Sequence, residues 1–200
     1  MSYAIVGFGE VGQALAHAFA RRNIKVAVAG RRPAEALAPQ ARAIGPEVVA
    51  TSLPQALEAD TIILAVPFAE HGAVAKALPS WEGKTIIDAT NAFGALPDEF
   101  DSIPSSAFVA KAFTGAKLVK GFNHLAAAKL AADPVVEGGH RVVFLSSDDE
   151  EAVAAVVALA KQLGFAPVKL GRLNEGGALV GTRGRTWGQL IFQDVFKKEQ

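Results

Sequence analysis

Three glycines near the start of the chain could bind the phosphates of a dinucleotide. Gly7, Gly9 and Gly12 form the pattern G-x-G-x-x-G directly after the short apolar run 2–6. The first glycine permits a tight turn, the second lets the backbone approach a pyrophosphate, and the third lets the following helix pack closely on the strand. The N–H groups of the first helical turn have no intrahelical partners, so they attract an anion. The predicted pyrophosphate-binding residues are Gly7, Phe8, Gly9, Glu10, Val11 and Gly12.

The residues after the second predicted strand indicate which nicotinamide dinucleotide binds. That strand covers 25–29 and is followed by Gly30, Arg31 and Arg32, with no acidic residue before Pro33. A site for NAD places Asp or Glu here to accept hydrogen bonds from the ribose 2′-hydroxyl. A carboxylate would repel a 2′-phosphate, whereas a guanidinium pairs with it. We therefore expect NADP(H), bound by Gly30 and the two arginines; the alternative is a solvated turn that carries two surface arginines.

Two further predicted strands should end beside the same cofactor. The uninterrupted apolar run that begins at Thr61 is typical of a central parallel strand buried on both faces. Ligands of open α/β sheets bind at the carboxyl ends of the strands. The residues expected to flank the ribose or the nicotinamide are Ala65, Val66 and Pro67. The alternative is that Pro67 only ends the strand. Asn91 follows the strand 84–87 and could hydrogen-bond the nicotinamide carboxamide or its ribose, whereas Asp88 should cap the loop.

A pocket for the hydride acceptor is expected beyond these strand ends. Phe68 and Phe93 would supply stacked apolar walls. Asn123 and His124, which follow another predicted strand, are candidates for the substrate side of the nicotinamide. A lone histidine at the start of a helix, such as His71, is more often a surface or capping residue. The acceptor itself is expected to be a small molecule.

The residues exclude several reactions that use a nicotinamide. The only tyrosine, Tyr3, lies in the first strand, so the Tyr-x-x-x-Lys pair of short-chain dehydrogenases is absent. The chain has no cysteine and four scattered histidines, so a zinc site and a cysteine nucleophile are not expected. No general acid stands out, and no catalytic residue is assigned. A flavin or deazaflavin acceptor fits this pattern, because its ring delocalises the incoming charge and the protein mainly orients it.

Composition argues against two classes of partner. The chain has 200 residues, half of them hydrophobic, and a formal net charge of zero. A nucleic-acid binder would be expected to carry a basic excess. No apolar run approaches the roughly 20 residues that span a bilayer, and the start of the chain lacks the pattern of a secretory signal. We expect a cytoplasmic protein that binds neither nucleic acid nor membrane.

Apolar runs alternate with helical patterns along the chain, which predicts an α/β fold: a Rossmann-like, doubly wound, mostly parallel sheet with a short C-terminal helical extension. The predicted strands are 2–6, 25–29, 48–50, 61–66, 84–87, 118–122, 142–145 and 167–170. Predicted helices follow the glycine turn and cover about 33–43, 54–58, 71–78, 105–113, 125–132, 148–163 and 187–198, and residues 135–140 are expected to form a flexible loop. Residues 1–170 would form the NADP-binding domain. Residues 171–200 would form an extension that packs on it or in a homodimer.

The chain resembles the NADPH-dependent oxidoreductases of the deazaflavin coenzyme F420, and their dinucleotide domain is similar to the cytoplasmic domain of the transmembrane ferric reductases. The resemblance covers nearly the whole chain in order. The stretches that carry it are residues 7–12, Gly30-Arg31-Arg32, Val66-Pro67-Phe68, Lys120-Gly121-Phe122-Asn123, residues 145–149, residues 163–168 and Leu170-Gly171-Arg172-Leu173.

This resemblance implies an NADPH-binding Rossmann domain whose pyrophosphate site is the glycine turn. It also implies a flavin-like acceptor in a cleft near Pro67, Asn91 and Asn123, between this domain and the C-terminal segment. Such proteins commonly carry serine where this chain has Gly30, so one hydroxyl contact to the 2′-phosphate is lost. The segment 171–189 looks like a bacterial branch of the family. Arg183 and Arg185 within it could pair with an acidic substrate tail; the alternative, which is favoured, is two solvated loop arginines.

Two other functions fit parts of the pattern. An NADPH-dependent imine reductase shares this type of dinucleotide domain but needs a long helical substrate domain, and only about 30 residues follow Gly171. A non-catalytic module that binds NADP(H) and reports its redox state to a partner would also lack acid–base residues. The first would be indicated by NADPH oxidation with a cyclic imine, and the second by different affinities for NADP and NADPH without turnover.

Overall fold

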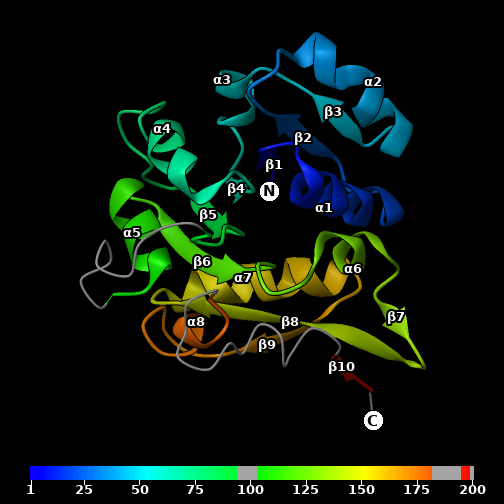
Figure 1. Ribbon diagram of the computed structural model, residues 1–200, viewed down its shortest axis with the longest axis vertical. Helices are drawn as coiled ribbons and strands as arrows, with labels where there is room; N and C mark the ends of the chain where they lie inside the picture. The colour runs from blue at the N-terminus through cyan, green and yellow to red at the C-terminus, as the bar shows by residue number, and fades with distance from the viewer. Residues whose placement is uncertain (94–102, 182–194, 199–200) are drawn as a thin grey trace.

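The computed structural model describes residues 1–93, 103–181 and 195–198 (Figure 1). Its strands are β1 (Tyr3–Val6), β2 (Val26–Ala29), β3 (Val48–Ala50), β4 (Thr61–Leu64), β5 (Thr85–Asp88), β6 (Lys117–Gly121), β7 (Val135–Val136), β8 (Gly139–Ser147), β9 (Ala166–Lys169) and β10 (Phe196–Lys197). Its helices are α1 (Glu10–Arg21), α2 (Ala34–Ile44), α3 (Leu53–Ala56), the 3₁₀ helix η1 (Phe68–Glu70), α4 (His71–Ala75), α5 (Ser105–Ala112), α6 (Ala127–Ala131), α7 (Glu150–Gln162) and α8 (Gly176–Leu179).

The strands form one mostly parallel sheet in the order β10-β8-β6-β5-β4-β1-β2-β3. The run from β3 to β6 is parallel throughout. The resulting order 3-2-1-4-5-6 is that of a Rossmann fold. β8 adds to β6 in the antiparallel sense, and β9 lies parallel to β8. The predicted fold class is therefore confirmed.

Helices cover both faces of this sheet, because residues along the parallel strands alternate between two apolar cores. Ile63, Ile87 and Val119 face the core that contains the apolar residues of α1 and α7. Ile62 and Ile86 face the other core, which contains residues of α3, α4 and α5. The helix α8 packs on β8 near the lower edge of the molecule in Figure 1. Because the strands from β3 to β6 are parallel, the loops that follow them meet at one edge of the sheet, its carboxyl edge.

Residues 135–140 form a tight hairpin, so the prediction of a flexible loop there is wrong. Val136 pairs with Gly139, which leaves Glu137 and Gly138 as a two-residue turn between β7 and β8. Both turn residues have positive φ, 48° and 74°. This is the conformation of a type I′ turn, whose twist matches that of antiparallel strands.

The predicted final helix is also wrong where the structure describes it. Phe196 and Lys197 form β10, which pairs with Arg141 and His140 of β8. The rest of that predicted helix lies outside the described residues, as do Arg183 and Arg185. In the described part of the chain, no helix has the length and apolarity needed to cross a membrane.

Candidate functional site

Two of the three glycines after β1 are required by the backbone around them. Gly7 has a φ of +101°, and a Cβ there would lie 2.4 Å from the carbonyl oxygen of Ala65. A Cβ on Gly12 would lie 1.9 Å from the carbonyl oxygen of Gly7. A side chain at either position would displace backbone, so both glycines hold β1, α1 and the end of β4 close together whether or not a ligand is present.

Gly9 differs, because nothing in the protein itself requires a glycine there. Its φ of −84° suits any residue, and a Cβ would meet no heavy atom within 4 Å. Gly9 is the N-cap of α1, and no side chain caps this helix. The space in front of Gly9 and the first N–H groups of α1, at Glu10 and Val11, is therefore open to an anionic group.

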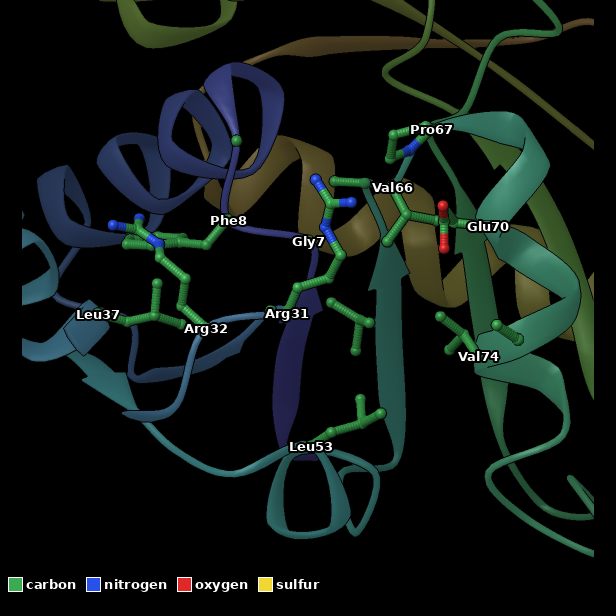
Figure 2. Close-up of a pocket in the computed structure, with 15 residues that line it drawn as sticks. Gly7, Phe8, Arg31, Arg32, Leu37, Leu53, Val66, Pro67, Glu70 and Val74 are labelled. Atoms are coloured by element: carbon green, nitrogen blue, oxygen red, sulfur yellow. The ribbon is translucent and has the colours of Figure 1, made fainter. Parts of the chain in front are cut away.

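A cavity of about 490 Å³ extends from this turn across the carboxyl ends of β1, β2 and β4 (Figure 2). The crevice lies at the topological switch point of the sheet, where β1 separates β2 from β4. The described residues that line it are Val6, Gly7, Phe8, Gly9, Gly30, Arg31, Arg32, Leu37, Leu53, Ala65, Val66, Pro67, Glu70, Ala73 and Val74. The structure thus brings Gly7, Phe8 and Gly9 together with the arginine pair and the end of β4. The other predicted residues of the turn, Glu10, Val11 and Gly12, are not among the described residues that line the cavity.

Sequence reasoning missed the walls of the cavity that come from helices. Leu37 belongs to α2, Leu53 to α3, Glu70 to η1 and Val74 to α4. A capping box fixes the start of α3, in which the Ser52 hydroxyl accepts from the backbone N–H of Gln55 at 3.4 Å. The Ser52 cap is visible in the sequence and indicates the helix, but the wall that Leu53 supplies follows only from the packing of α3 beside β1 and β2.

The two arginines differ in what holds them. Arg31 is exposed and makes no hydrogen bond or ion pair with a described residue; in Figure 2 its side chain passes Gly7 toward Val66. Arg32 turns the other way and lies beside Phe8 (Figure 2). Its Nη2 donates to Oε1 of Gln40 at 3.1 Å. The cavity is therefore bordered by two guanidinium groups, of which Arg32 is held by a hydrogen bond and Arg31 has no partner among the described residues. Gly30 beside them has room for a side chain, because its Cβ would meet only ordinary contacts, the nearest 3.6 Å away.

A buried polar network lies at the carboxyl ends of β5 and β6. Asp88 is fully buried, and Lys120 is 2% exposed. The Lys120 Nζ lies 3.0 Å from Oδ2 of Asp88 and also donates to the carbonyl oxygen of Thr90. Oδ1 of Asp88 accepts from the Thr90 N–H at 2.9 Å and from its hydroxyl at 2.7 Å. Asp88 therefore caps this loop as predicted, and its partner is Lys120, for which no local sequence pattern indicates this role.

The same loop carries Asn91 to Asn123. Nδ2 of Asn91 donates to the Asn123 carbonyl oxygen at 2.7 Å, and Nδ2 of Asn123 donates to Oδ1 of Asn91 at 3.1 Å. Asn123 Nδ2 also donates to the carbonyl oxygen of Val180 at 3.0 Å, just after α8. These bonds join the loop after β5, the loop after β6 and the C-terminal segment. Neither asparagine is among the described residues that line the 490 Å³ cavity.

The remaining predicted acceptor residues have different surroundings. His124 is fully buried, with its ring 4.9 Å from that of Phe144, and burial lowers its pKa to about 4 although the Val142 backbone opposes this shift. At neutral pH the imidazole is therefore uncharged and out of reach of solvent.

Phe93 is 74% exposed. The Phe68 ring lies 4.8 Å from that of His71, whose Nδ1 bonds the Phe68 carbonyl oxygen, a local contact at the start of α4. Among the described residues, no three His, Asp or Glu side chains form a group that could hold a metal ion.

The chain matches a family model and several known proteins. The family described as NADP oxidoreductase, coenzyme F420-dependent, matches residues 2–92. The crystal structure of hypothetical protein SMa0349 from Sinorhizobium meliloti is 35% identical with a TM-score of 0.89, covering 100% of this chain and 96% of that one. A structure from Arthrobacter sp. FB24, named as a candidate F420-dependent NADP reductase, is 26% identical with a TM-score of 0.73, and the match covers 86% of each chain.

More distant similarities extend to larger proteins. Metalloreductase STEAP3 from Rattus norvegicus is 27% identical over 176 residues, which are 84% of this chain and 33% of that protein. The chain thus spans about a third of the length of this curated relative. A reductive aminase from Aspergillus terreus, solved with NADPH and ethyl levulinate, is 22% identical with a TM-score of 0.65. That match covers 95% of this chain and 59% of the other, and it shows a shared fold.

Proposed function

Because the chain belongs to the family of coenzyme F420-dependent NADP oxidoreductases, we propose that it binds NADPH in the cavity described above and passes hydride to a flavin or deazaflavin acceptor. The bound dinucleotide would supply the hydride. The chain would supply the binding groups, the orientation of the two rings and the exclusion of water between them.

The observation that carries this proposal is the contrast between Gly9 and its neighbouring glycines. Gly7 and Gly12 are needed by the backbone of the protein itself, whereas a Cβ on Gly9 would point into open space. A glycine at this position is explained by a ligand whose anionic group approaches the backbone closely. The first N–H groups of α1 would then bind the pyrophosphate. Arg31 and Arg32 would bind the 2′-phosphate, and Ala65, Val66 and Pro67 would lie against the ribose and nicotinamide.

The acceptor would lie beyond Pro67, against the loops after β5 and β6. Asn91 and Asn123 are held by each other and by the carbonyl oxygen of Val180, so their amides have a fixed orientation. Phe68 and the exposed Phe93 offer apolar surface for a ring. The ionisable groups near these loops do not suggest an acid catalyst: Asp88 and Lys120 bond each other, and His124 is uncharged. A ring that accepts hydride without protein acid–base help fits these surroundings.

The C-terminal segment is part of the same proposal. We propose that residues 1–170 form the NADP-binding domain and that residues 171–200 form an extension that packs on it or in a dimer. Leu173 packs into the core beside α4 and α5, and the Val180 carbonyl bonds Asn123. Whether two copies of the chain associate through this extension would be measured by light scattering at the concentrations used for the assays.

The decisive experiment is to follow NADPH oxidation by absorbance with coenzyme F420 and, separately, with FMN. We expect rapid oxidation with one of them, because the acceptor ring needs orientation more than proton transfer. Oxidation with neither, despite demonstrable NADPH binding, would contradict the proposed acceptor class. Turnover with a cyclic imine would then indicate imine reduction, and different affinities for NADP and NADPH without any turnover would indicate a redox-sensing module.

The role of Gly9 can be tested separately by binding. Gly9→Ala should raise the Kd for NADPH about 10- to 100-fold, because a methyl group would occupy space that the pyrophosphate needs, at a cost of about 1–3 kcal/mol. The melting temperature should fall only slightly, since the methyl meets no protein atom within 4 Å and the loss is limited to the poorer N-cap preference of alanine. Titration calorimetry would measure the first effect and thermal unfolding the second.

Gly72→Ala is a matched control for this variant. Gly72 in α4 also has open space where a Cβ would lie, but it is not among the described residues that line the cavity. Its replacement should leave NADPH affinity unchanged. If Gly9→Ala bound NADPH as tightly as the wild type, the pyrophosphate could not lie against the start of α1.

A further inference from the structure

Arg32 is connected to the glycine turn by a chain of hydrogen bonds through two glutamine side chains. Nη2 of Arg32 donates to Oε1 of Gln40 at 3.1 Å. Nε2 of Gln40 donates to Oε1 of Gln13 at 2.7 Å, and Nε2 of Gln13 donates to the carbonyl oxygen of Phe8 at 3.1 Å. These three hydrogen bonds therefore link the loop after β2, the helices α2 and α1, and the loop after β1. Both glutamines are half-buried, whereas Arg32 is exposed.

The direction of these bonds is determined at the Phe8 end. A backbone carbonyl only accepts, so Gln13 must turn its NH₂ group toward Phe8. The Gln13 amide oxygen is then left to accept from the NH₂ group of Gln40. As a result Gln40 presents its amide oxygen to the loop after β2. An amide oxygen suits a guanidinium, which carries only donors. The two glutamines therefore form an oriented acceptor for Arg32 in particular.

Holding Arg32 in this way should matter when a ligand binds. A free arginine loses much rotamer freedom when it is ordered, and this loss weakens the interaction that orders it. Gln40 occupies one N–H group of Arg32 and leaves the others available for an anion. The guanidinium already lies at the edge of the cavity beside Phe8 (Figure 2). Arg31, by contrast, has no such anchor among the described residues.

We infer that Gln40 and Gln13 are positioning residues that hold Arg32 ready for the 2′-phosphate, and that they contribute to discrimination between NADPH and NADH. This inference rests on the proposed function. Because the chain of bonds ends on the carbonyl of Phe8, it also ties the 2′-phosphate site to the pyrophosphate turn. Arg32 would then be the fixed member of the arginine pair and Arg31 the mobile one.

The test is a binding experiment with both dinucleotides. Gln40→Ala should raise the Kd for NADPH about 2- to 10-fold, the range expected when one long side chain loses its pre-ordering, and should leave the Kd for NADH unchanged. The same substitution made in the Arg32→Ala variant should have no further effect on NADPH, because there is no guanidinium left to hold. Gln162→Ala, on the exposed side of α7, is the matched control and should change neither affinity.

Four outcomes would overturn the inference. Equal increases of the two Kd values would show that Gln40 acts only on the local fold. An additive loss in the Arg32→Ala background would show that Gln40 acts independently of Arg32. An unchanged NADPH affinity in Gln40→Ala, with a clear loss in Arg32→Ala, would remove the positioning role alone. If Arg32→Ala itself left NADPH affinity unchanged, the proposed role of Arg32 in binding the 2′-phosphate would fail as well, so the two failures are distinguishable.

Discussion

Replacing Arg31 and Arg32 together with alanine should raise the Kd for NADPH about 100-fold or more and leave the Kd for NADH almost unchanged. Both guanidinium groups border the cavity, one anchored to Gln40 and one unbonded among the described residues. A hydrogen bond to a charged group contributes about 1.5–3 kcal/mol, and two such bonds are lost. NADH has a hydroxyl in place of the 2′-phosphate, so it should not depend on this pair. Fluorescence titration with each dinucleotide would measure the ratio.

A control must separate this local contact from a general loss of positive charge. Arg42→Ala combined with Lys161→Ala removes the same net charge from two exposed residues that do not line the cavity. This variant should keep the wild-type preference. If the arginine variant lost affinity equally for both dinucleotides, the 2′-phosphate would have to bind elsewhere, and the absence of an acidic residue after β2 would have another explanation.

The glycine turn and the arginine pair could be predicted from the sequence because their signals are local. G-x-G-x-x-G lies between an apolar strand and an amphipathic helix, and the structure places β1 and α1 on either side of it. The Rossmann order then brings the residues after β1, β2 and β4 together, although they are distant in sequence. Leu37 and Val74 could not be assigned to the cavity in this way, since their position depends on how α2 and α4 pack on the sheet.

The errors had two causes: contacts between segments that lie far apart in the chain, and one local turn with an unusual residue. The apolar residues of 187–198 are spaced as in a helix, but Phe196 and Lys197 instead pair with β8, more than 50 residues away. The hairpin at Glu137 was missed because the first of its two turn residues is a glutamate, and a glutamate with positive φ is uncommon. His124 follows a strand end, as a site residue would, but it is buried against Phe144. At Phe196 and at His124 tertiary packing decided the structure, whereas the hairpin depends on its own turn residues.

Lys120→Met should lower the free energy of unfolding by about 3–5 kcal/mol, because it leaves the buried carboxylate of Asp88 without its counter-charge. Both side chains are removed from water and their charged atoms are 3.0 Å apart. The effect should be largely reversed in the double variant Lys120→Met with Asp88→Asn. Asparagine at 88 is neutral and keeps an oxygen that can accept the two bonds from Thr90. Urea unfolding of the three proteins would measure this difference.

Lys169→Met is a matched control, since Lys169 forms an ion pair with Glu150 at the surface, at 2.7 Å. Exposed pairs contribute little, so this variant should unfold almost like the wild type. A Lys120→Met protein as stable as the Lys169→Met protein would show that the buried pair contributes no more to stability than the exposed pair. The double variant has a second use. Lys120 also holds the carbonyl of Thr90, one residue before Asn91. If stability returns but turnover with the acceptor does not, the buried pair serves to position Asn91 rather than only to stabilise the sheet.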